Sequence, residues 1–339
     1  MDIIGELVRC AQAQPQRIVL PEGTEPRTLK AADRAMAHGV AKVILLGNQD
    51  DINVLIERFD LQNLRNATII NPETAPNRQA YADALYELRK SKGLTEEQAY
   101  QKVAAPLYYG CMMIKMGDAD GELAGARNAT ANVLRPALQI IKTEPGITCV
   151  SGAMILFTHA PEYGEEGVLV MGDVAVTPEP TAEQLAQIAI ETARTSMAVA
   201  KFEAPLVAML SFSTKGSAQH EVCDKVIEAT KLAQAQCPEI TFDGELQADA
   251  ALVPAVAALK SPGSIVAGRA NVLIVPNLEV GNIAYKLVQR LGHAQAIGPI
   301  LQGVARPVND LSRSCSVDDV YKMIAITANQ AIALKEREG

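Results

Sequence analysis

The chain has 339 residues, which allows about two domains of ordinary size. Hydrophobic residues make up 48% and charged residues 21%, a composition typical of a globular protein rather than a disordered one. The net charge of -8 argues against a general nucleic-acid binder, because binding a phosphate backbone needs a basic surface. No apolar run approaches the ~20 residues of a membrane-spanning helix, and residues 1–12 lack the basic start of a secretory signal. We therefore expect a cytoplasmic protein without nucleic-acid or membrane partners.

The cysteines and histidines give no pattern of a disulfide framework or a metal site. The six cysteines are scattered and none forms a CxxC pair, so we expect free thiols in a reducing compartment. The four histidines are far apart in the sequence, and no carboxylate near them has metal-ligand spacing. We expect no metal and no resident cofactor.

In the first half of the chain, short β-branched runs alternate with longer amphipathic stretches, which is typical of α/β architecture. The pattern predicts strands at 17–22, 41–47 and 67–70. It predicts helices at 27–39, 77–92, 96–104 and 130–142, the third of them opened by a capping box at Thr95. Pro145 and Gly146 then interrupt the chain, and we place the main domain boundary there.

The same alternation continues beyond this boundary. It predicts strands at 147–155, 167–176, 206–212, 240–243 and 272–276, and helices at 181–202, 219–236, 249–259 and 281–291. A last helix runs from about Val317 to the terminus, and no second-domain strand follows it, so we expect it to pack on the first domain. The predicted domains are therefore 1–145 with 304–339, and 146–303.

The stretch NDLSRSCSVDD, residues 309–319, has two possible interpretations. Ser316 is a good N-cap, and Asp319 three residues later suits a reciprocal cap at the positive end of the helix dipole. Ser312 and Arg313 lie upstream of the N-cap residue and have no role in capping the helix. A guanidinium beside a helix N-terminus can bind an oxyanion or a phosphate. The stretch is either a well-capped helix start or a place where chemistry occurs.

A second candidate is LSFSTKGSAQ, residues 210–219, where an apolar strand gives way to a small polar turn before a helix. Gly216 permits close approach of the backbone to an anion, and Ser213 and Lys215 can donate to it, so the turn could hold a phosphate. The alternative is an ordinary βα turn, since many such turns are rich in serine and glycine.

Two charged clusters have weaker patterns. On their spacing alone, Arg89 and Arg135 are surface charges at helix ends. The cluster of Asp243, Glu245 and Asp249 could bind a divalent cation, but a solvated loop or a packing network is the preferred interpretation.

Several motifs, in order along the whole chain, closely resemble those of the phosphate acetyltransferases. These motifs are PEGTEPRTLKAA (21–32), LRKSKG (88–93), LSFSTKGSA (210–218), DGELQAD (243–249), AGRANVLIVPNLEVGNIAYK (267–286) and GPILQGVARPVNDLSRSCSVDD (298–319). The resemblance implies two three-layer α/β domains of the isocitrate and isopropylmalate dehydrogenase type, a site in the interdomain cleft, and a homodimer. It also implies the reaction acetyl-CoA + phosphate ⇌ acetyl phosphate + CoA, with coenzyme A as a substrate and without a metal or an acyl-enzyme.

The resemblance assigns roles residue by residue. It implies that Asp319 is the base, that Arg313 stabilises charge in the transition state, and that Ser312 is an adjacent active-site serine. The CoA thiolate then attacks acetyl phosphate directly. The further substrate- or CoA-binding candidates are Arg89, Arg135, Thr130, Ser213, Lys215, Gly216, Asn282 and Lys286.

The chain departs from the family pattern at a few positions near these residues. Ser314 stands where the family usually has glycine, and Thr177 where asparagine is usual. The usual His-Ser-Thr-Ala-Asp is replaced by NATAN at residues 128–132.

Three rival functions are open at this point. A phosphate butyryltransferase shares the chemistry. A non-catalytic, acetyl-CoA-sensing regulatory module is known fused to malic enzymes, but this chain retains Arg313 and Asp319 and we expect no fused domain. An NAD-linked dehydrogenase of the same fold would need a dinucleotide fingerprint, which the sequence lacks.

Overall fold

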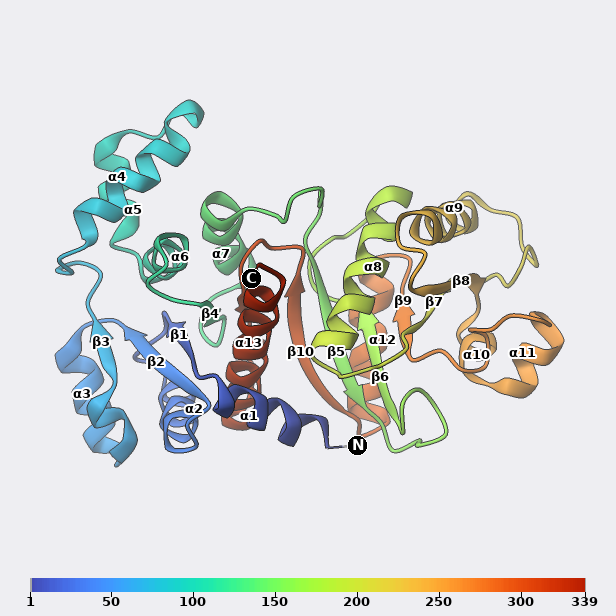
Figure 1. The fold of residues 1–339 in the computed structure, drawn as a ribbon, viewed down its shortest axis with the longest axis horizontal. Helices are drawn as coiled ribbons and strands as arrows, with labels where there is room; N and C mark the ends of the chain where they lie inside the picture. The colour runs from blue at the N-terminus through green and yellow to red at the C-terminus, as the bar shows by residue number, and fades with distance from the viewer. Residues whose placement is uncertain (1, 339) are drawn as a thin grey trace. The chain divides into compact units, whose positions relative to one another are not determined.

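The computed structural model describes residues 2–338, and the chain divides into two compact units (Figure 1). One unit comprises residues 2–145 together with the C-terminal segment that begins at Val304, and is called here the discontinuous unit. The other comprises residues 146–303 and is called the continuous unit. Each unit is built around its own sheet with helices packed against it, so the predicted α/β class is confirmed.

The discontinuous unit has a five-stranded sheet in the order β11-β4-β1-β2-β3, and every neighbouring pair is parallel. Its strands are β1 Gln16–Leu20, β2 Ala41–Leu46, β3 Thr68–Ile70, β4 Gly121–Ala124 and β11 Val308–Asp310. Every residue of the inner strand β4 and of the edge strand β11 is buried, as expected for a parallel sheet with helices on its faces.

The helices of this unit are α1 Ile3–Ala13, α2 Pro26–Ala37, α3 Gln49–Arg58, α4 Arg78–Arg89, α5 Glu96–Val103, α6 Pro106–Met116, α7 Thr130–Pro136 and α13 Val317–Glu338. The short turns are η1 Gln62–Asn66, η2 Lys90–Lys92 and the π turn η3 Ala137–Ile141. Thr95 and Gln98 form the predicted capping box of α5. The helix α13, red in Figure 1, packs on α1, α2, β1 and β4. Its buried face includes Ile324 and Ala328, which places it in the core of this unit.

The continuous unit has a six-stranded mixed sheet in the order β10-β5-β6-β9-β7-β8. The strands β6, β9, β7 and β8 are parallel, whereas β5 runs antiparallel to both β6 and β10. The bounds are β5 Ser151–Phe157, β6 Val168–Gly172, β7 Leu206–Leu210, β8 Thr241–Leu246, β9 Val272–Ile274 and β10 Gln295–Gln302.

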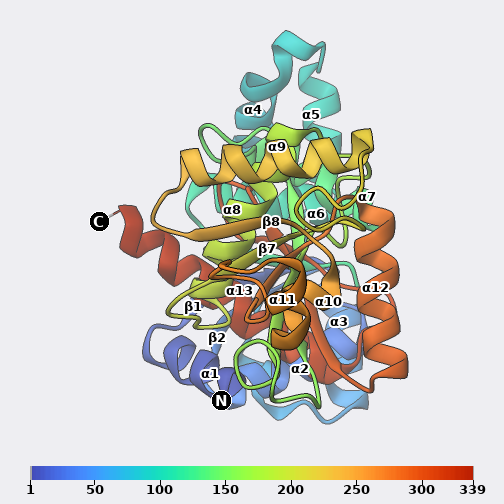
Figure 2. The ribbon, with the colours of Figure 1, turned by 90° about the vertical axis from the view of Figure 1, so that its right-hand side faces the viewer.

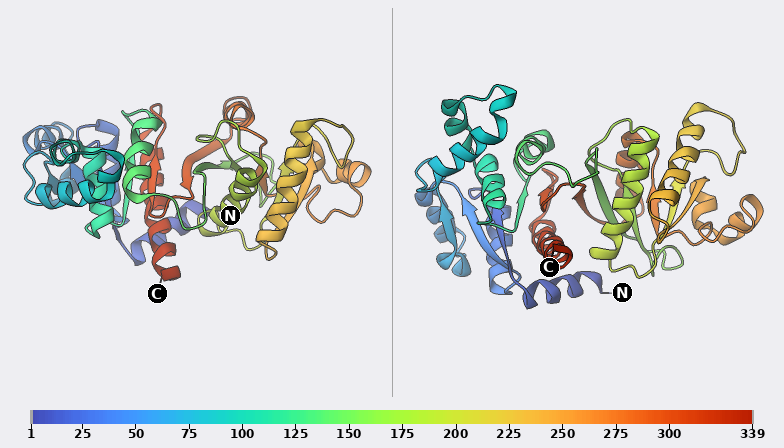
Figure 3. Two further views of the ribbon diagram at one scale, coloured as in Figure 1. Left: turned by 90° about the horizontal axis from the view of Figure 1, so that it is seen from above. Right: turned by 45° about the horizontal axis from the view of Figure 1, so that its top comes forward.

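The helices of the continuous unit are α8 Ala182–Ala198, α9 Glu221–Gln236, α10 Ala248–Leu252, α11 Pro254–Lys260 and α12 Leu278–Leu291. Figures 2 and 3 show α8 and α12 on opposite sides of the sheet, and α9 lies beside α8. A capping box between Thr181 and Gln184 begins α8. No helix within residues 2–338 is long and apolar enough to cross a membrane.

The structure corrects the sequence prediction at several elements. The predictions missed α1, α3, α6, β4, β10 and β11. The single helix expected at 249–259 is two helices, because Pro254 lacks an N–H and starts α11 as its first residue. The helix expected at 130–142 changes to a π turn after Pro136. The omission of β11 matters most for function, because the loop with Ser312 and Arg313 follows this strand directly.

Candidate active site

The topology of the discontinuous unit indicates where a ligand would bind relative to its sheet. The chain runs from β1 through β2 to β3 on one side and then returns to place β4 and β11 on the other side of β1. The strand order therefore reverses between β1 and β4. Parallel sheets bind ligands beyond the carboxyl ends of the strands at such a switch point. The loops that follow β1, β4 and β11 meet this condition. Thr130 begins the helix after the second of these loops, and Ser312 and Arg313 lie in the third.

Glu22, which follows β1, organises the loop that follows β4. Its buried carboxylate accepts hydrogen bonds from the backbone N–H groups of Ala126, Arg127 and Asn128 at 2.8, 2.9 and 2.9 Å. The side-chain amide of Asn128 donates to the same carboxylate at 2.8 Å. One carboxylate thus fixes three consecutive residues of the loop.

Arg27, near the start of α2, joins this loop to the one after β11. Its Nη2 donates to the carbonyl oxygen of Ala126 at 2.7 Å, and its Nη1 to those of Arg313 and Cys315 at 2.8 and 2.9 Å. The hydrogen bond from its Nε to Glu25, 2.8 Å long, is the main reason that the pKa of Arg27 is raised above its ordinary value. Sequence reasoning missed both Glu22 and Arg27. The available signal was a cation in the first turn of a helix, where the helix dipole disfavours one.

The start of α13 shows the reciprocal cap that the sequence allowed. The Asp319 backbone N–H donates to Ser316 Oγ at 3.1 Å, and Asp319 Oδ2 accepts from Ser316 N and Oγ at 2.9 and 2.8 Å. Asp319 Oδ1 makes no hydrogen bond within residues 2–338. The capping interpretation is therefore correct in geometry, and it leaves one oxygen of this half-buried carboxylate available.

The neighbouring Asp318 is occupied by structural contacts. Burial acts to raise its pKa, but hydrogen bonds from Lys322 and Arg34 outweigh burial and lower the pKa. The Arg34 contact is 2.9 Å long. Of the two adjacent carboxylates, Asp318 is thus committed to α2 and to its own helix, and Asp319 alone has an oxygen open to a substrate.

Ser312 and Arg313 are both exposed on the loop that Arg27 holds. The Arg313 guanidinium has no hydrogen-bond or ion-pair partner in the described chain. The Ser312 hydroxyl lies 2.9 Å from the Ser314 hydroxyl and accepts a hydrogen bond from the Ser314 backbone N–H at 3.3 Å. The loop thus offers a free cation and a hydroxyl that is engaged locally.

Cys315, in the same loop, is the nearest thiol to these residues in sequence. It is 7% exposed, and burial is the main reason that its pKa is raised to about 11, although Arg27 acts in the opposite direction. A thiol with this pKa stays protonated at neutral pH and is a poor nucleophile.

Thr130, the first residue of α7, contacts the strand that leads into the loop. Its hydroxyl donates to Asp310 Oδ2 at 2.5 Å. Asp310 is 2% exposed, its Oδ1 has no hydrogen-bond partner in the described chain, and burial raises its pKa to about 6. Asp310 was not singled out from the sequence. It links α7 to the segment that continues into Ser312 and Arg313.

Arg89 ends α4 and Arg135 lies in the last turn of α7, and the charges of both act on Tyr108. Burial raises the pKa of Tyr108, and the charges of Arg135 and Arg89 both act to lower it. Lys102 Nζ lies 5.2 Å from the centroid of the same ring. Arg135 is exposed and Arg89 is half-buried. Charges on α4, α5 and α7 therefore all act on Tyr108 of α6.

In the continuous unit, the turn around Gly216 is closed by carboxylates. The Gly216 N–H and the buried Ser213 hydroxyl donate to Glu245 Oε1 at 2.7 and 2.9 Å. Lys215 Nζ pairs with Asp243 and donates to the Gly244 carbonyl oxygen at 3.0 Å. The donors that the sequence offers to a phosphate are thus engaged within the protein. Asp243 and Glu245 serve the packing of this turn, in line with the preferred interpretation of that acidic cluster.

Asp249, the third acidic residue of the cluster, pairs with Lys260 at 2.8 Å. Among residues 2–338, no group of three or more histidine, cysteine, aspartate or glutamate side chains could hold a metal ion.

Asn282 and Lys286 lie one turn apart on α12 of the continuous unit. Lys286 Nζ donates to Asn282 Oδ1 at 2.8 Å, and Asn282 Nδ2 donates to the Val174 carbonyl oxygen at 3.2 Å. Val174 is the second residue after β6, so the pair lies near the carboxyl end of a parallel strand, where ligands bind in sheets of this kind.

Comparison with known proteins identifies the family. The sequence profile described as "Phosphate acetyl/butaryl transferase" matches residues 2–328. The chain belongs to this family. Phosphate acetyltransferase of Thermoanaerobacterium thermosaccharolyticum is 53% identical over 331 residues, which are 98% of this chain and 100% of that protein. A phosphotransacetylase structure from Streptococcus pyogenes is 44% identical, with a TM-score of 0.92 over 98% of both chains. The EutD phosphotransacetylase structure from Staphylococcus aureus is 43% identical, with a TM-score of 0.89 over 97% of this chain and 98% of that one.

The structure gives local accounts for three departures of this phosphate acetyl/butyryl transferase from the family pattern. Asn128, which replaces histidine, binds the Glu22 carboxylate through its side chain. Ser314, which replaces glycine, places its hydroxyl against that of Ser312. Thr177, which replaces asparagine, donates from its hydroxyl to the Val150 carbonyl oxygen at 2.9 Å. Of the three, only Ser314 contacts a residue that the family resemblance assigns to catalysis.

Proposed function

We propose that the chain catalyses acetyl-CoA + phosphate ⇌ acetyl phosphate + CoA. The support from comparison is that relatives named phosphate acetyltransferase are 43–53% identical to it over nearly its whole length. The observation that carries the proposal is the loop after β11. There, a carboxylate with one free oxygen and an arginine without a side-chain partner in the described chain lie six positions apart, on a backbone that Arg27 holds in place.

The proposed step is a direct displacement on acetyl phosphate. The CoA sulfur attacks the carbonyl carbon while the S–H proton passes to Asp319. The S–C bond forms as the C–O bond to the phosphoryl group breaks, and inorganic phosphate leaves. No covalent bond to the protein forms, in keeping with a Cys315 thiol whose pKa is raised to about 11.

Proton transfer alone would be too costly in this step. A thiol has a pKa of about 8.5 and an ordinary aspartate about 3.9, so complete transfer before attack costs about 6 kcal/mol. Arg313 can reduce this cost, because a guanidinium stabilises both an incoming thiolate and the charge that develops on the carbonyl oxygen or phosphate. Asp319 then accepts the proton as attack proceeds. Holding two anionic substrates in line supplies several further kcal/mol through orientation.

The remaining residues bind and orient the substrates in this proposal. Arg89 and Arg135 hold phosphate groups of CoA, and the action of both charges on the pKa of Tyr108 supports a shared role. Ser312 donates a hydrogen bond to a substrate and does not act as a nucleophile. The other proposed substrate-binding residues are Thr130, Ser213, Lys215, Gly216, Asn282 and Lys286.

The test is release of free CoA from acetyl-CoA by the purified chain, followed with a thiol reagent with and without phosphate. We expect release that depends on phosphate, and a chain that releases no CoA under these conditions would refute the proposal. The same assay with butyryl-CoA separates the two reactions of the family. One methylene changes affinity for a pocket by about 1–3 kcal/mol, and we expect a higher kcat/KM for acetyl-CoA. A higher value for butyryl-CoA would make the chain a butyryltransferase.

We further propose that the chain is a homodimer, as the family resemblance implies. An apolar stripe on α12 supports it: Val280, Ile283, Leu287 and Leu291 recur at helical spacing and are 43%, 58%, 52% and 76% exposed. A second copy of the chain would cover this stripe. Analytical ultracentrifugation should give twice the mass of one chain, and Leu287→Asp should shift the protein towards one chain. A parent protein that sediments as a single chain at micromolar concentration would contradict the dimer.

Finally, we propose that the enzyme works in the cytoplasm without a metal or resident cofactor. All six cysteines are unpaired in the structure, which suits a reducing compartment. Activity should survive EDTA treatment and gel filtration. Loss of activity that added metal restores would refute this part of the proposal.

A further inference from the structure

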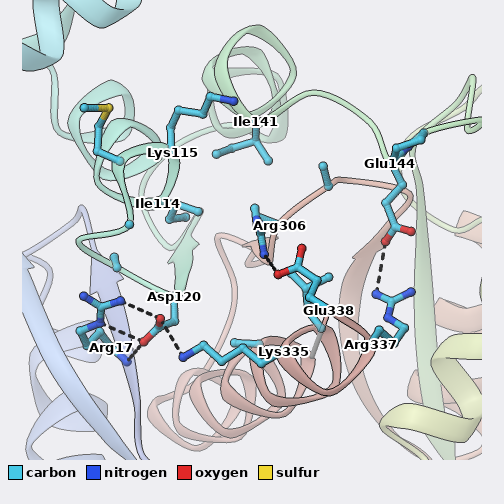
Figure 4. A pocket seen from close by; sticks show the side chains of 17 residues that line it. Arg17, Ile114, Lys115, Asp120, Ile141, Glu144, Arg306, Lys335, Arg337 and Glu338 are labelled. Carbon is cyan, nitrogen blue, oxygen red and sulfur yellow. Dashed lines mark hydrogen bonds and ion pairs between the residues drawn. The ribbon is translucent and has the colours of Figure 1, made fainter.

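A cavity lies in the discontinuous unit, at the far end of α13 from the Ser316 cap (Figure 4). Its volume is about 730 Å³, within the usual range for small-molecule sites. It is lined by the starts of β1 and β4, the end of α6, the η3 turn and the last turn of α13. The 22 residues of α13 span about 33 Å, so this cavity is distinct from the loop with Ser312 and Arg313.

The two segments by which the chain passes between its units also line the cavity. Glu144 and Pro145 belong to the first passage, and Ala305 and Arg306 to the second. The two segments pair with each other, since the Ala305 N–H donates to the Lys142 carbonyl oxygen at 3.0 Å. A molecule bound here would therefore contact both passages and the end of α13 together.

The cavity carries an excess of positive charge in an acidic protein. Its charged lining comprises five cations, Arg17, Lys115, Arg306, Lys335 and Arg337, and three carboxylates, Asp120, Glu144 and Glu338. The chain as a whole has a net charge of -8. A local excess of cations against this global charge is the arrangement expected where an anion binds.

The inner part of this lining is fixed. Asp120 accepts from Arg17 Nη2 at 2.9 Å and pairs with Lys335 Nζ at 3.0 Å. Burial acts to raise the pKa of Asp120, but the hydrogen bonds from Arg17 outweigh burial and hold the pKa well below its usual range. These three groups form a satisfied base of the cavity and have no need of a ligand.

The outer part is held more loosely. Arg306 pairs with Glu338 at 2.7 Å, and Arg337 with Glu144 at 3.5 Å, and both guanidinium groups are about half exposed. Ion pairs with this exposure are weak, so another anion can replace their carboxylates. Lys115 extends towards Ile141 in Figure 4 and has no ion-pair or hydrogen-bond partner within residues 2–338.

We propose that this cavity binds a small organic anion with two or three carboxylates. Two of its carboxylates take the places of Glu338 and Glu144 on Arg306 and Arg337, where the planar guanidinium suits two-point contact with a carboxylate. The Lys115 ammonium pairs with the third carboxylate of a tricarboxylate, or with the nearest carboxylate oxygen of a dicarboxylate. The carbon skeleton lies against the apolar part of the lining, which includes Ile114, Ile141 and Leu334.

The test is isothermal titration of the purified full chain with tricarballylate, with acetate at equal ionic strength as the single-charge control. We expect saturable 1:1 binding of tricarballylate and none of acetate. Each of the variants Arg306→Gln and Arg337→Gln should weaken binding about tenfold or more, as expected for loss of a hydrogen-bonded charge. Lys115→Gln should also weaken it, and this variant removes no hydrogen bond or ion pair within residues 2–338.

Two controls locate the binding site. Arg65→Gln makes the same charge change on an exposed residue outside the cavity, and Arg313→Gln makes it in the candidate active site. Both should bind tricarballylate as the parent does. The proposal is overturned if the parent shows no saturable binding in the millimolar range. It is equally overturned if the three cavity variants bind like the parent, if Arg313→Gln alone loses binding, or if Arg65→Gln weakens it as much as the cavity variants do.

Discussion

Replacing Asp319 by asparagine separates catalysis from helix capping. In the structure, Asp319 Oδ2 accepts two hydrogen bonds from Ser316, 2.8 and 2.9 Å long, and an asparagine carbonyl oxygen can accept both. The variant therefore loses only a negative charge near the helix N-terminus, which is worth about 0.3–1 kcal/mol. As a base, Asp319 should contribute about 100- to 10,000-fold to the rate. We expect kcat to fall by that factor, while the urea midpoint of unfolding changes little.

Two matched variants complete this experiment. Ser316→Ala removes the N-cap and should cost about 1 kcal/mol of stability while retaining most of the activity. Asp318→Asn removes the adjacent carboxylate, which pairs with Arg34 and Lys322, and should leave kcat close to that of the parent. Steady-state phosphate-dependent CoA release and urea unfolding of all three variants give the comparison. If Asp319→Asn kept parental kcat, or if all three variants lost activity in proportion to stability, Asp319 would be a cap and not a base.

Three other predictions follow from contacts near the site. Ser314→Gly removes the Ser314 hydroxyl, which lies 2.9 Å from the Ser312 hydroxyl. The Ser312 hydroxyl is then free for acetyl phosphate, so KM for this substrate should fall about two- to tenfold in steady-state assays. An unchanged KM would show that Ser312 does not bind this substrate. Arg89→Gln and Arg135→Gln should each raise KM for CoA at least tenfold and leave KM for phosphate unchanged. Equal effects on the two KM values would show that these residues do not bind CoA specifically. Burial raises the pKa of Asp310 to about 6. The stability that its protonated carboxyl provides is therefore fully present below the unfolded pKa of about 3.9, and it is lost as pH rises through about 6. Between pH 4 and pH 8, urea unfolding should therefore show Asp310→Asn gaining up to about 3 kcal/mol relative to the parent, and a pH-independent difference would show that Asp310 does not titrate in this way.

Local interactions made parts of this fold predictable. Capping boxes join residues three positions apart, so Thr95, Thr181 and Ser316 could be identified from the sequence without knowledge of the fold. Apolar runs such as residues 41–47 predict strands because a parallel sheet is covered on both faces and selects continuous hydrophobic segments.

The short strands β4 and β11 could not be predicted in the same way. Each contains buried polar residues, Glu122 in β4 and Asn309 and Asp310 in β11, and those of β11 are bound by distant groups. In β11, Asn309 donates to Thr327 of α13 at 2.9 Å, and Asp310 accepts from Thr130, 180 positions earlier in the chain. A three-residue segment with the sequence Val-Asn-Asp has the composition of a turn until those partners are in place.

The sequence by itself determined the α/β class, most helix starts, the family and the position of Ser312, Arg313 and Asp319 along the chain, because these depend on local periodicity, capping and motif order. Only the tertiary structure showed that Arg27 holds the backbone of Arg313, 286 positions away, and that of Ala126, 99 positions away. It alone also showed which carboxylate of the Asp318–Asp319 pair is occupied, and that five cations meet at the far end of α13. Such contacts join residues that the fold brings together across strands and helices, and no local pattern in the chain specifies them.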